Sequence, residues 1–234
     1  MSRERPSGPI RWEVQAKPGG GVRTLARLDP RDACTYRGLV ARNTATITRA
    51  LGACSFANRT EPGGRPRSLA SGRARWRRAI LHAVVEARSG IAIVSDVRDC
   101  YPSIGPSALR RTGLQDEELF AFLRGLWGSG VHGLPVGPPP SAMLADGVLA
   151  HADRAAAAAG VVPIRWVDDV ILLSDDPART GRAFDAWRRA LGEVGLEAHE
   201  DKTHRMPAIE LTHPPAPSGS SLDRARARAI IASP

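Results

Sequence analysis

The sequence has few cysteines, fewer acidic than basic residues, and no long hydrophobic run. The three cysteines, at positions 34, 54 and 100, are odd in number and form no Cys-x-x-Cys pair, which argues against a disulfide framework and against a zinc site. No run of about 18 apolar residues occurs, and the first residues include no apolar segment of signal-peptide length. We therefore expect a cytoplasmic protein without a membrane partner, whose cysteines are reduced and buried.

The composition is that of a folded and basic protein. Hydrophobic residues make up 42% of the 234 positions, which is enough for one or two domains with a hydrophobic core. Lysine and arginine outnumber aspartate and glutamate by 33 to 24, so that the formal net charge is +9. Such a charge suits a polyanion such as nucleic acid, but it also suits a protein whose charges are simply solvated. Charge alone leaves both interpretations open.

Hydrophobic periodicity predicts strands that alternate with helices. The predicted elements are a hairpin over 12–32 with its turn at 19–21, a helix from Asp32, an amphipathic helix with a basic face over 72–90, a strand over 91–95, a helix over 116–130, a helix over 141–160 capped by Ser141, a hairpin over 161–174 turning at Asp168 and Asp169, and a helix over 177–195. This order describes an α+β layer sandwich preceded by a basic subdomain.

Two carboxylates, Asp168 and Asp169, interrupt an apolar segment. Ionised carboxylates in an apolar setting cost several kcal/mol or shift their pKa, and Asp-Asp suits a two-residue turn poorly. An exposed turn whose aspartates accept backbone hydrogen bonds would explain the pair alone. Asp96, however, ends the strand over 91–95 in the same way. If 91–95 and 164–167 pair in one sheet, three acids meet at one edge.

Three adjacent carboxylates repel one another unless cations lie between them. Oxygen ligands without histidine or cysteine favour Mg²⁺ or Mn²⁺ over zinc. Two such ions can activate a 3′-hydroxyl and stabilise a departing pyrophosphate. The acids therefore indicate nucleotidyl transfer.

Several segments resemble motifs of reverse transcriptases in order and spacing. The palm-like segments are IAIVSDVRDCYPSI, GLPVGPPPSAMLADGVLAHAD, IRWVDDVILL and GLEAHEDKT, and AKPGGGVRTLARLDPRD with SFANR is similar to the fingers of the bacterial members. The resemblance covers residues 11 to 205. It implies an α+β right-hand palm, an antiparallel sheet packed on helices, with a basic fingers subdomain and an absent or rudimentary thumb. The implied parts are fingers over 1–90, palm over 91–205 with parts of 105–140 packed with the fingers, and a Pro/Ser-rich linker with a short basic tail over 206–234.

The resemblance also implies roles for individual residues. Asp96 and Asp168 would bind two Mg²⁺ ions, replaceable by Mn²⁺, with Asp169 as a weaker or positioning ligand and the carbonyl of Val97 as a further one. Lys202 would give a proton to the pyrophosphate. The residues implied to contact the nucleotide are Lys17 and Arg23 at the triphosphate, Asp99 near the triphosphate and sugar, Tyr101 beneath the sugar, where it excludes a 2′-hydroxyl, and Gly133, Leu134, Pro135 and Gly137 in a loop bracing the template–nucleotide pair.

Two departures from the family pattern keep several functions open. Val136 stands where many relatives have glutamine, and few residues follow Lys202, so that a protein partner would have to supply a thumb. The leading interpretation is an RNA-directed DNA polymerase that takes an RNA template, a DNA or RNA primer and deoxynucleoside triphosphates, and that serves phage defence, a retroelement or a fused system. The alternatives are a catalytically idle RNA-binding or assembly subunit and a template-independent nucleotidyltransferase.

Overall fold

A computed structural model describes residues 8–16, 22–59, 67–87 and 90–212. Within these residues no helix combines the length and the apolar composition needed to cross a membrane. The chain forms two compact units: one draws on the described residues of 1–51, 99–151 and 193–196, and the other on those of 52–98, 152–192 and 197–234. The boundary predicted at residue 90 does not coincide with this division, because the helix before it packs on the sheet that follows it.

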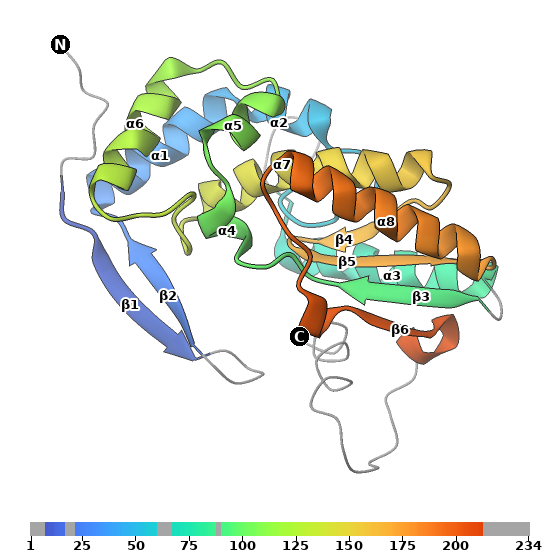
Figure 1. The fold of residues 1–234 in the computed structure, drawn as a ribbon. Helices are drawn as coiled ribbons and strands as arrows, with labels where there is room; N and C mark the ends of the chain where they lie inside the picture. The colour runs from blue at the N-terminus through green and yellow to red at the C-terminus, as the bar shows by residue number, and fades with distance from the viewer. Residues whose placement is uncertain (1–7, 17–21, 60–66, 88–89, 213–234) are drawn as a thin grey trace. The chain divides into compact units, whose positions relative to one another are not determined.

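The first unit contains the N-terminal hairpin and a group of helices (Figure 1). Strands β1 (Arg11–Ala16) and β2 (Val22–Arg27) pair antiparallel, as predicted, while the turn expected at 19–21 lies outside the described residues. The helices are α1 (Pro30–Arg42), α2 (Thr44–Ala50), α4 (Cys100–Ser103), α5 (Pro106–Arg111), α6 (Glu117–Gly128) and the first part of α7 (Pro139–Ala158). Helix α6 confirms the helix predicted over 116–130, and its buried residues are Leu119, Phe120, Phe122, Leu123 and Leu126.

Aspartates begin two of these helices. The Asp29 side chain accepts a hydrogen bond from the Arg31 N–H and caps α1. The helix therefore begins at Pro30 and not at Asp32, the start expected from the sequence. Asp116 caps α6 in the same way through the Leu119 N–H. The predicted Ser141 cap is wrong: α7 begins at Pro139, and proline suits a first helical turn because it has no N–H to satisfy.

The second unit is built on a four-stranded antiparallel sheet with strand order β4-β5-β3-β6. Its strands are β3 (Ile91–Ser95), β4 (Ile164–Trp166), β5 (Asp169–Ser174) and β6 (His204–Pro207). The predicted pairing of 91–95 with 164–167 is wrong, because β5 lies between β3 and β4. Ser95 pairs with Val170, so that the end of β3 still lies beside the start of β5.

Helices cover both faces of this sheet. Figure 1 shows α3 (Leu69–Ala87) on one side of the strands and α8 (Pro177–Glu193) on the other. Trp76, Ile80 and Val84 of α3 pack in a core cluster with alternate residues of the strands. The facing residues of α8 that are buried are Phe184, Trp187 and Leu191. The amphipathic pattern of 72–90 is thus confirmed, although Leu81 and Val85 are exposed.

The segment after Lys202 completes the sheet. Met206 and Pro207 pair with the start of β3, and the short helix η2 (Ala208–Leu211) adds two buried side chains to the core beneath α3. The linker predicted from residue 206 therefore does not begin there, because these residues bury apolar surface and satisfy a sheet edge. Of the linker and short basic tail predicted over 206–234, residues 213–234 lie outside the described residues.

Candidate functional site

Asp96 follows β3 directly and is buried, with 7% of its surface exposed. Its carbonyl accepts a hydrogen bond from the His199 N–H at 2.7 Å, and the Arg98 N–H donates to Glu197 at 2.9 Å. Val97 lies between these two bonds and bridges to Ala198. Because neighbouring residues of an extended segment direct their backbone groups to opposite sides, the Val97 carbonyl points away from Ala198, on the side of β5.

The turn between β4 and β5 consists of Val167 and Asp168. The sequence placed this turn at Asp168 and Asp169, one residue later, but Asp169 already pairs with Trp166. Val167 adopts φ +56°, a left-handed conformation that is rare for a β-branched residue. Strain of this kind persists only where the surroundings enforce it, and it often marks a functional position.

The carboxyl groups of Asp96, Asp168 and Asp169 interact with one another at this end of the sheet. Burial, and then the neighbouring Asp96 carboxylate, raise the pKa of Asp168 well above its ordinary value. Burial, followed by the charges of Asp168 and Asp96, raises the pKa of Asp169 in the same direction. A cation placed among the three groups would favour their ionised forms.

Lys202 supplies one positive charge to this cluster. It lies in the short helix η1 (Glu200–Lys202), and its Nζ donates to Oδ2 of Asp96. The Lys202 N–H bonds to the carbonyl of His199, and the Thr203 hydroxyl lies 2.8 Å from that of Ser95. These bonds attach η1 to the end of β3 and place the ammonium beside the carboxylates.

Arg73 is a further cation near the site that sequence reasoning missed. It lies on α3, with its guanidinium carbon 5.1 Å from the centre of the Trp166 ring, and its charge lowers the pKa of Asp169 against the larger effect of burial. The sequence indicated only an arginine-rich helix face at 72–90. Which of its arginines approaches the acids depends on how α3 crosses the sheet, and helical spacing does not specify that.

The donor chemistry of the cluster fits divalent cations. Oδ1 of Asp96 is buried and has no hydrogen-bond partner in the structure, and the charge of Asp96 acts on the carboxyl groups of Asp168 and Asp169. Hard oxygen donors of this kind suit Mg²⁺ or Mn²⁺. Among the described residues, no three histidine, cysteine or acidic side chains already form a metal cage. Because the Lys202 ammonium already donates to Asp96, an ion that binds Asp96 would compete with it.

The first unit brings Tyr101 and the loop after α6 together. The Leu134 N–H donates to the Tyr101 carbonyl at 2.8 Å, and the Trp127 indole N–H donates to the Gly133 carbonyl at 2.6 Å. Gly133 has φ +58°, and a Cβ there would lie 2.3 Å from the Pro102 carbonyl oxygen. Only glycine permits this approach between the loop and α4.

The other predicted nucleotide contacts also lie in the first unit. Pro135 is buried, and Gly137, at φ +116°, adjoins Val136, whose carbonyl accepts from the Ala26 N–H of β2 at 2.8 Å. Arg23 is exposed on the same strand. Asp99 precedes α4 in a left-handed conformation. Lys17 lies outside the described residues.

Comparison with known proteins finds a likeness in the fold but none in the sequence. No protein-family model and no curated protein matches the chain. Solved structures do match. Telomerase from Candida albicans, in complex with a fragment of telomeric RNA, aligns with a TM-score of 0.55 at 14% identity, over 88% of this chain and 42% of that one. Apo telomerase from Candida tropicalis gives 0.53 at 11% identity, over 88% and 45%.

A form of the Candida tropicalis enzyme truncated from its C-terminal domain gives a TM-score of 0.54 at 11% identity, over 92% of this chain and 51% of that one. Telomerases are reverse transcriptases. The chain has a reverse-transcriptase-like fold. The predicted fold class, α+β with an antiparallel sheet packed on helices, is confirmed. The chain spans about half the length of these telomerases or less, and at such low identity the likeness concerns the fold alone.

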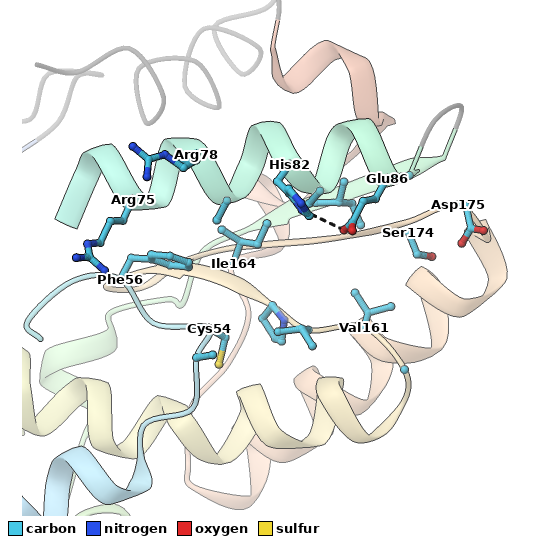
Figure 2. Close-up of a pocket in the computed structure, with 18 residues that line it drawn as sticks. Cys54, Phe56, Arg75, Arg78, His82, Glu86, Val161, Ile164, Ser174 and Asp175 are labelled. Carbon is cyan, nitrogen blue, oxygen red and sulfur yellow. Dashed lines mark ion pairs between the residues drawn. The ribbon is translucent and has the colours of Figure 1, made fainter. Parts of the chain in front are cut away.

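The second unit of this reverse-transcriptase-like fold also contains a pocket of about 720 Å³ (Figure 2). Phe56, Val161 and Ile164 supply apolar walls. Arg75 and Arg78 of α3 lie at one end, and the exposed His82–Glu86 pair of the same helix lies further along it. None of the three interacting aspartates lines this pocket, which is therefore separate from the carboxylate site.

Proposed function

We propose that the chain is an RNA-directed DNA polymerase that adds deoxynucleotides to the 3′-hydroxyl of a primer. The observation that carries the proposal is the strand register, which places Asp96, Asp168 and Asp169 at one end of the sheet of a reverse-transcriptase-like fold. An RNA template and a DNA or RNA primer agree with the net charge of +9 and with the RNA bound by one of the telomerases.

Asp96 and Asp168 would hold two Mg²⁺ or Mn²⁺ ions, with Asp169 as a weaker or positioning ligand and the carbonyl of Val97 as another. When bound, such ions favour deprotonation of the 3′-hydroxyl and neutralise charge on the departing pyrophosphate. The protein's part is to keep three carboxylates close together in a half-buried setting. Burial and mutual repulsion raise the pKa values of Asp168 and Asp169. A cation between the two carboxylates would offset both effects and stabilise their ionised forms.

Lys202 would act at the leaving group. Its Nζ donates a hydrogen bond to Asp96. A proton of this ammonium would pass to a phosphate oxygen of the pyrophosphate as that group departs. Release of the ammonium from Asp96 would free the same carboxylate oxygen for an ion. Both roles require the side chain of Lys202 to move. The exposed fraction of this side chain is 33%, which leaves it room to do so.

The nucleotide would be held by residues of the first unit. Arg23, with Lys17, would bind the triphosphate, and Asp99 would lie near the triphosphate and sugar. The ring of Tyr101 would exclude a 2′-hydroxyl, which favours deoxynucleotides. Support comes from the loop of Gly133, Pro135 and Gly137, whose close approach to α4 fixes the backbone of Tyr101.

Three finer assignments belong to the same proposal. The likeness to bacterial reverse transcriptases depends on the sequence motifs, since the solved structures that match come from Candida. Service in phage defence or a retroelement has the same basis. A thumb supplied by a protein partner would provide the grip on the primer–template duplex.

A second candidate function is that of a catalytically idle relative that binds RNA. The Lys202–Asp96 ion pair favours it, because an internal ammonium stabilises the acidic cluster without an ion. The two candidates differ in whether ions displace Lys202.

Incorporation of labelled deoxynucleotides on a primed RNA template, with Mg²⁺ or Mn²⁺, tests the proposal. Copying that is lost in Asp168→Asn but kept in Asp175→Asn, an exposed acid at the far end of β5, would support it. Addition without template would indicate the template-independent transferase. RNA binding without incorporation under either metal would support the idle relative. Incorporation of ribonucleotides gained in Tyr101→Ala would test the sugar contact.

A further inference from the structure

The turn that carries Asp168 adjoins a buried ion pair to which the proposed mechanism gives no role. Arg165 in β4 is 0% exposed, and its Nε donates to Oδ2 of Asp153 in α7 at 2.8 Å. The Asp153 side chain is 1% exposed. Removing two charges from water is unfavourable and can cancel their attraction, so a pair of this kind is weak evidence for a role in stability.

The Arg165 guanidinium also binds the backbone of the turn. Its Nη1 donates to the carbonyl of Val167 at 2.7 Å, so that one side chain holds Asp153 and the turn together. The Arg165 backbone is fixed as well: its N–H donates to Cys54 at 2.8 Å, and its carbonyl accepts from Phe56 at 3.1 Å. Hydrogen bonds therefore fix Arg165 both at its backbone and at its guanidinium group.

The residue that Arg165 holds is the strained one. Val167 adopts φ +56°, a left-handed conformation that is unfavourable for a β-branched residue. Such a conformation persists only when neighbouring bonds impose it. The hydrogen bond from Arg165 reaches the carbonyl of Val167 itself, directly before Asp168.

We propose that the Arg165–Asp153 pair is a positioning device that keeps the Val167–Asp168 turn in its strained conformation and thereby directs Asp168 and Asp169 toward Asp96. The use of those carboxylates rests on the proposed function, whereas the hold on the turn does not. Arg165 and Asp153 act through the backbone of the turn and touch no substrate.

The deciding variant is the double substitution Arg165→Met with Asp153→Leu. It removes both charges at similar volume and leaves no buried charge unpaired, so that loss of the pair need not unfold the sheet. The matched control is Arg188→Met with Glu200→Leu, which removes an exposed ion pair of the same unit. Hydrogen–deuterium exchange of the backbone amides over 164–172, read by mass spectrometry, reports the turn without any ion or substrate.

In the double variant we expect the amides of the turn to exchange at least tenfold faster, while those of β3 keep their wild-type protection and the control variant is unchanged. Adding Val167→Gly to the double variant should reduce the strain and restore part of the protection, because glycine adopts positive φ freely. Wild-type exchange at the turn would overturn the proposal, and so would equal loosening of every strand.

If the double variant does not fold, Arg165→Lys takes its place. The lysine keeps a charge opposite Asp153 but lacks the planar fork that also reaches Val167. The same local acceleration would support the proposal, and wild-type protection at the turn would overturn it.

Mn²⁺ affinity, measured by electron paramagnetic resonance, separates this proposal from the function. Binding weakened at least tenfold in the double variant supports the link between turn and carboxylates. A loosened turn with unchanged Mn²⁺ affinity overturns that link. Wild-type protein that binds no Mn²⁺ contradicts the proposed function, and the exchange experiment then still decides whether the pair holds the turn.

Discussion

Gly133→Ala tests the close approach between the loop after α6 and α4. A Cβ at this position would lie 2.3 Å from the Pro102 carbonyl oxygen and 2.4 Å from that of Tyr101, and both are backbone atoms that cannot rotate away. The conformation at φ +58° costs an alanine about 1–2 kcal/mol, and the overlap adds about 1–3 kcal/mol. We therefore expect the free energy of unfolding to fall by about 2–5 kcal/mol.

Gly130→Ala supplies the matched control. Gly130 also has a positive φ, of +90°, but an added Cβ there meets nothing within 4 Å. It should lose only the conformational cost of about 1–2 kcal/mol. Urea unfolding of both variants, followed by tryptophan fluorescence, measures the difference; Trp127, whose indole N–H donates to the Gly133 carbonyl, contributes to that signal. Equal losses in the two variants would refute the reasoning, because the contact would then contribute nothing.

Three further perturbations test other parts of the structure. Gly90→Ala places a Cβ 1.9 Å from the Ser174 carbonyl oxygen and should destabilise by about 3 kcal/mol, whereas Gly128→Ala, in an open helical position, should be neutral or stabilising in the same thermal unfolding assay. Burial opposes ionisation of Asp116, but hydrogen bonds from Asn43 and from the α6 backbone hold its pKa below the ordinary value. Asp116→Ala should therefore cost about 1–2 kcal/mol in urea unfolding at pH 7. The difference from wild type should begin to shrink as the pH falls below about 4, the ordinary pKa of aspartate, and should be lost only below the lowered pKa of the folded state, where the wild-type carboxylate is protonated; a constant difference would contradict this. Lys202→Met should lower the melting temperature without metal and increase the stabilisation by added Mn²⁺, because the ammonium no longer competes for Asp96; a smaller stabilisation than in wild type would refute the competition.

Local pattern predicts most elements of this fold but not their arrangement. The helix over 116–130 follows from apolar residues that repeat with a period of 3.6 residues. The strand over 91–95 follows from a short continuous apolar run. The order of β4 and β5 does not follow. Both are short apolar runs buried on both faces, so nothing in either run identifies the central strand.

The candidate site shows the same division. The approach of Asp96 to the pair at 168 and 169 follows from the sequence only in part. The pattern places acids at the ends of two apolar strands, but the pairing it suggests, of 91–95 with 164–167, is not the one that forms: the end of β3 lies beside the start of β5. The turn at Val167 is not predictable, since a β-branched residue at positive φ contradicts the local preference that a sequence expresses. Arg73 and Arg165 were missed because their roles depend on which helix and which carbonyl lie opposite them.

Counting Mn²⁺ ions bound to the wild-type protein and to Asp168→Asn, by loss of the free-ion signal in electron paramagnetic resonance, tests the central claim most directly. With a deoxynucleoside triphosphate present, the account predicts two ions on the wild-type protein, at least one fewer on Asp168→Asn, and no change in Asp175→Asn. Equal binding by wild type and Asp168→Asn, or no binding by either, would contradict it.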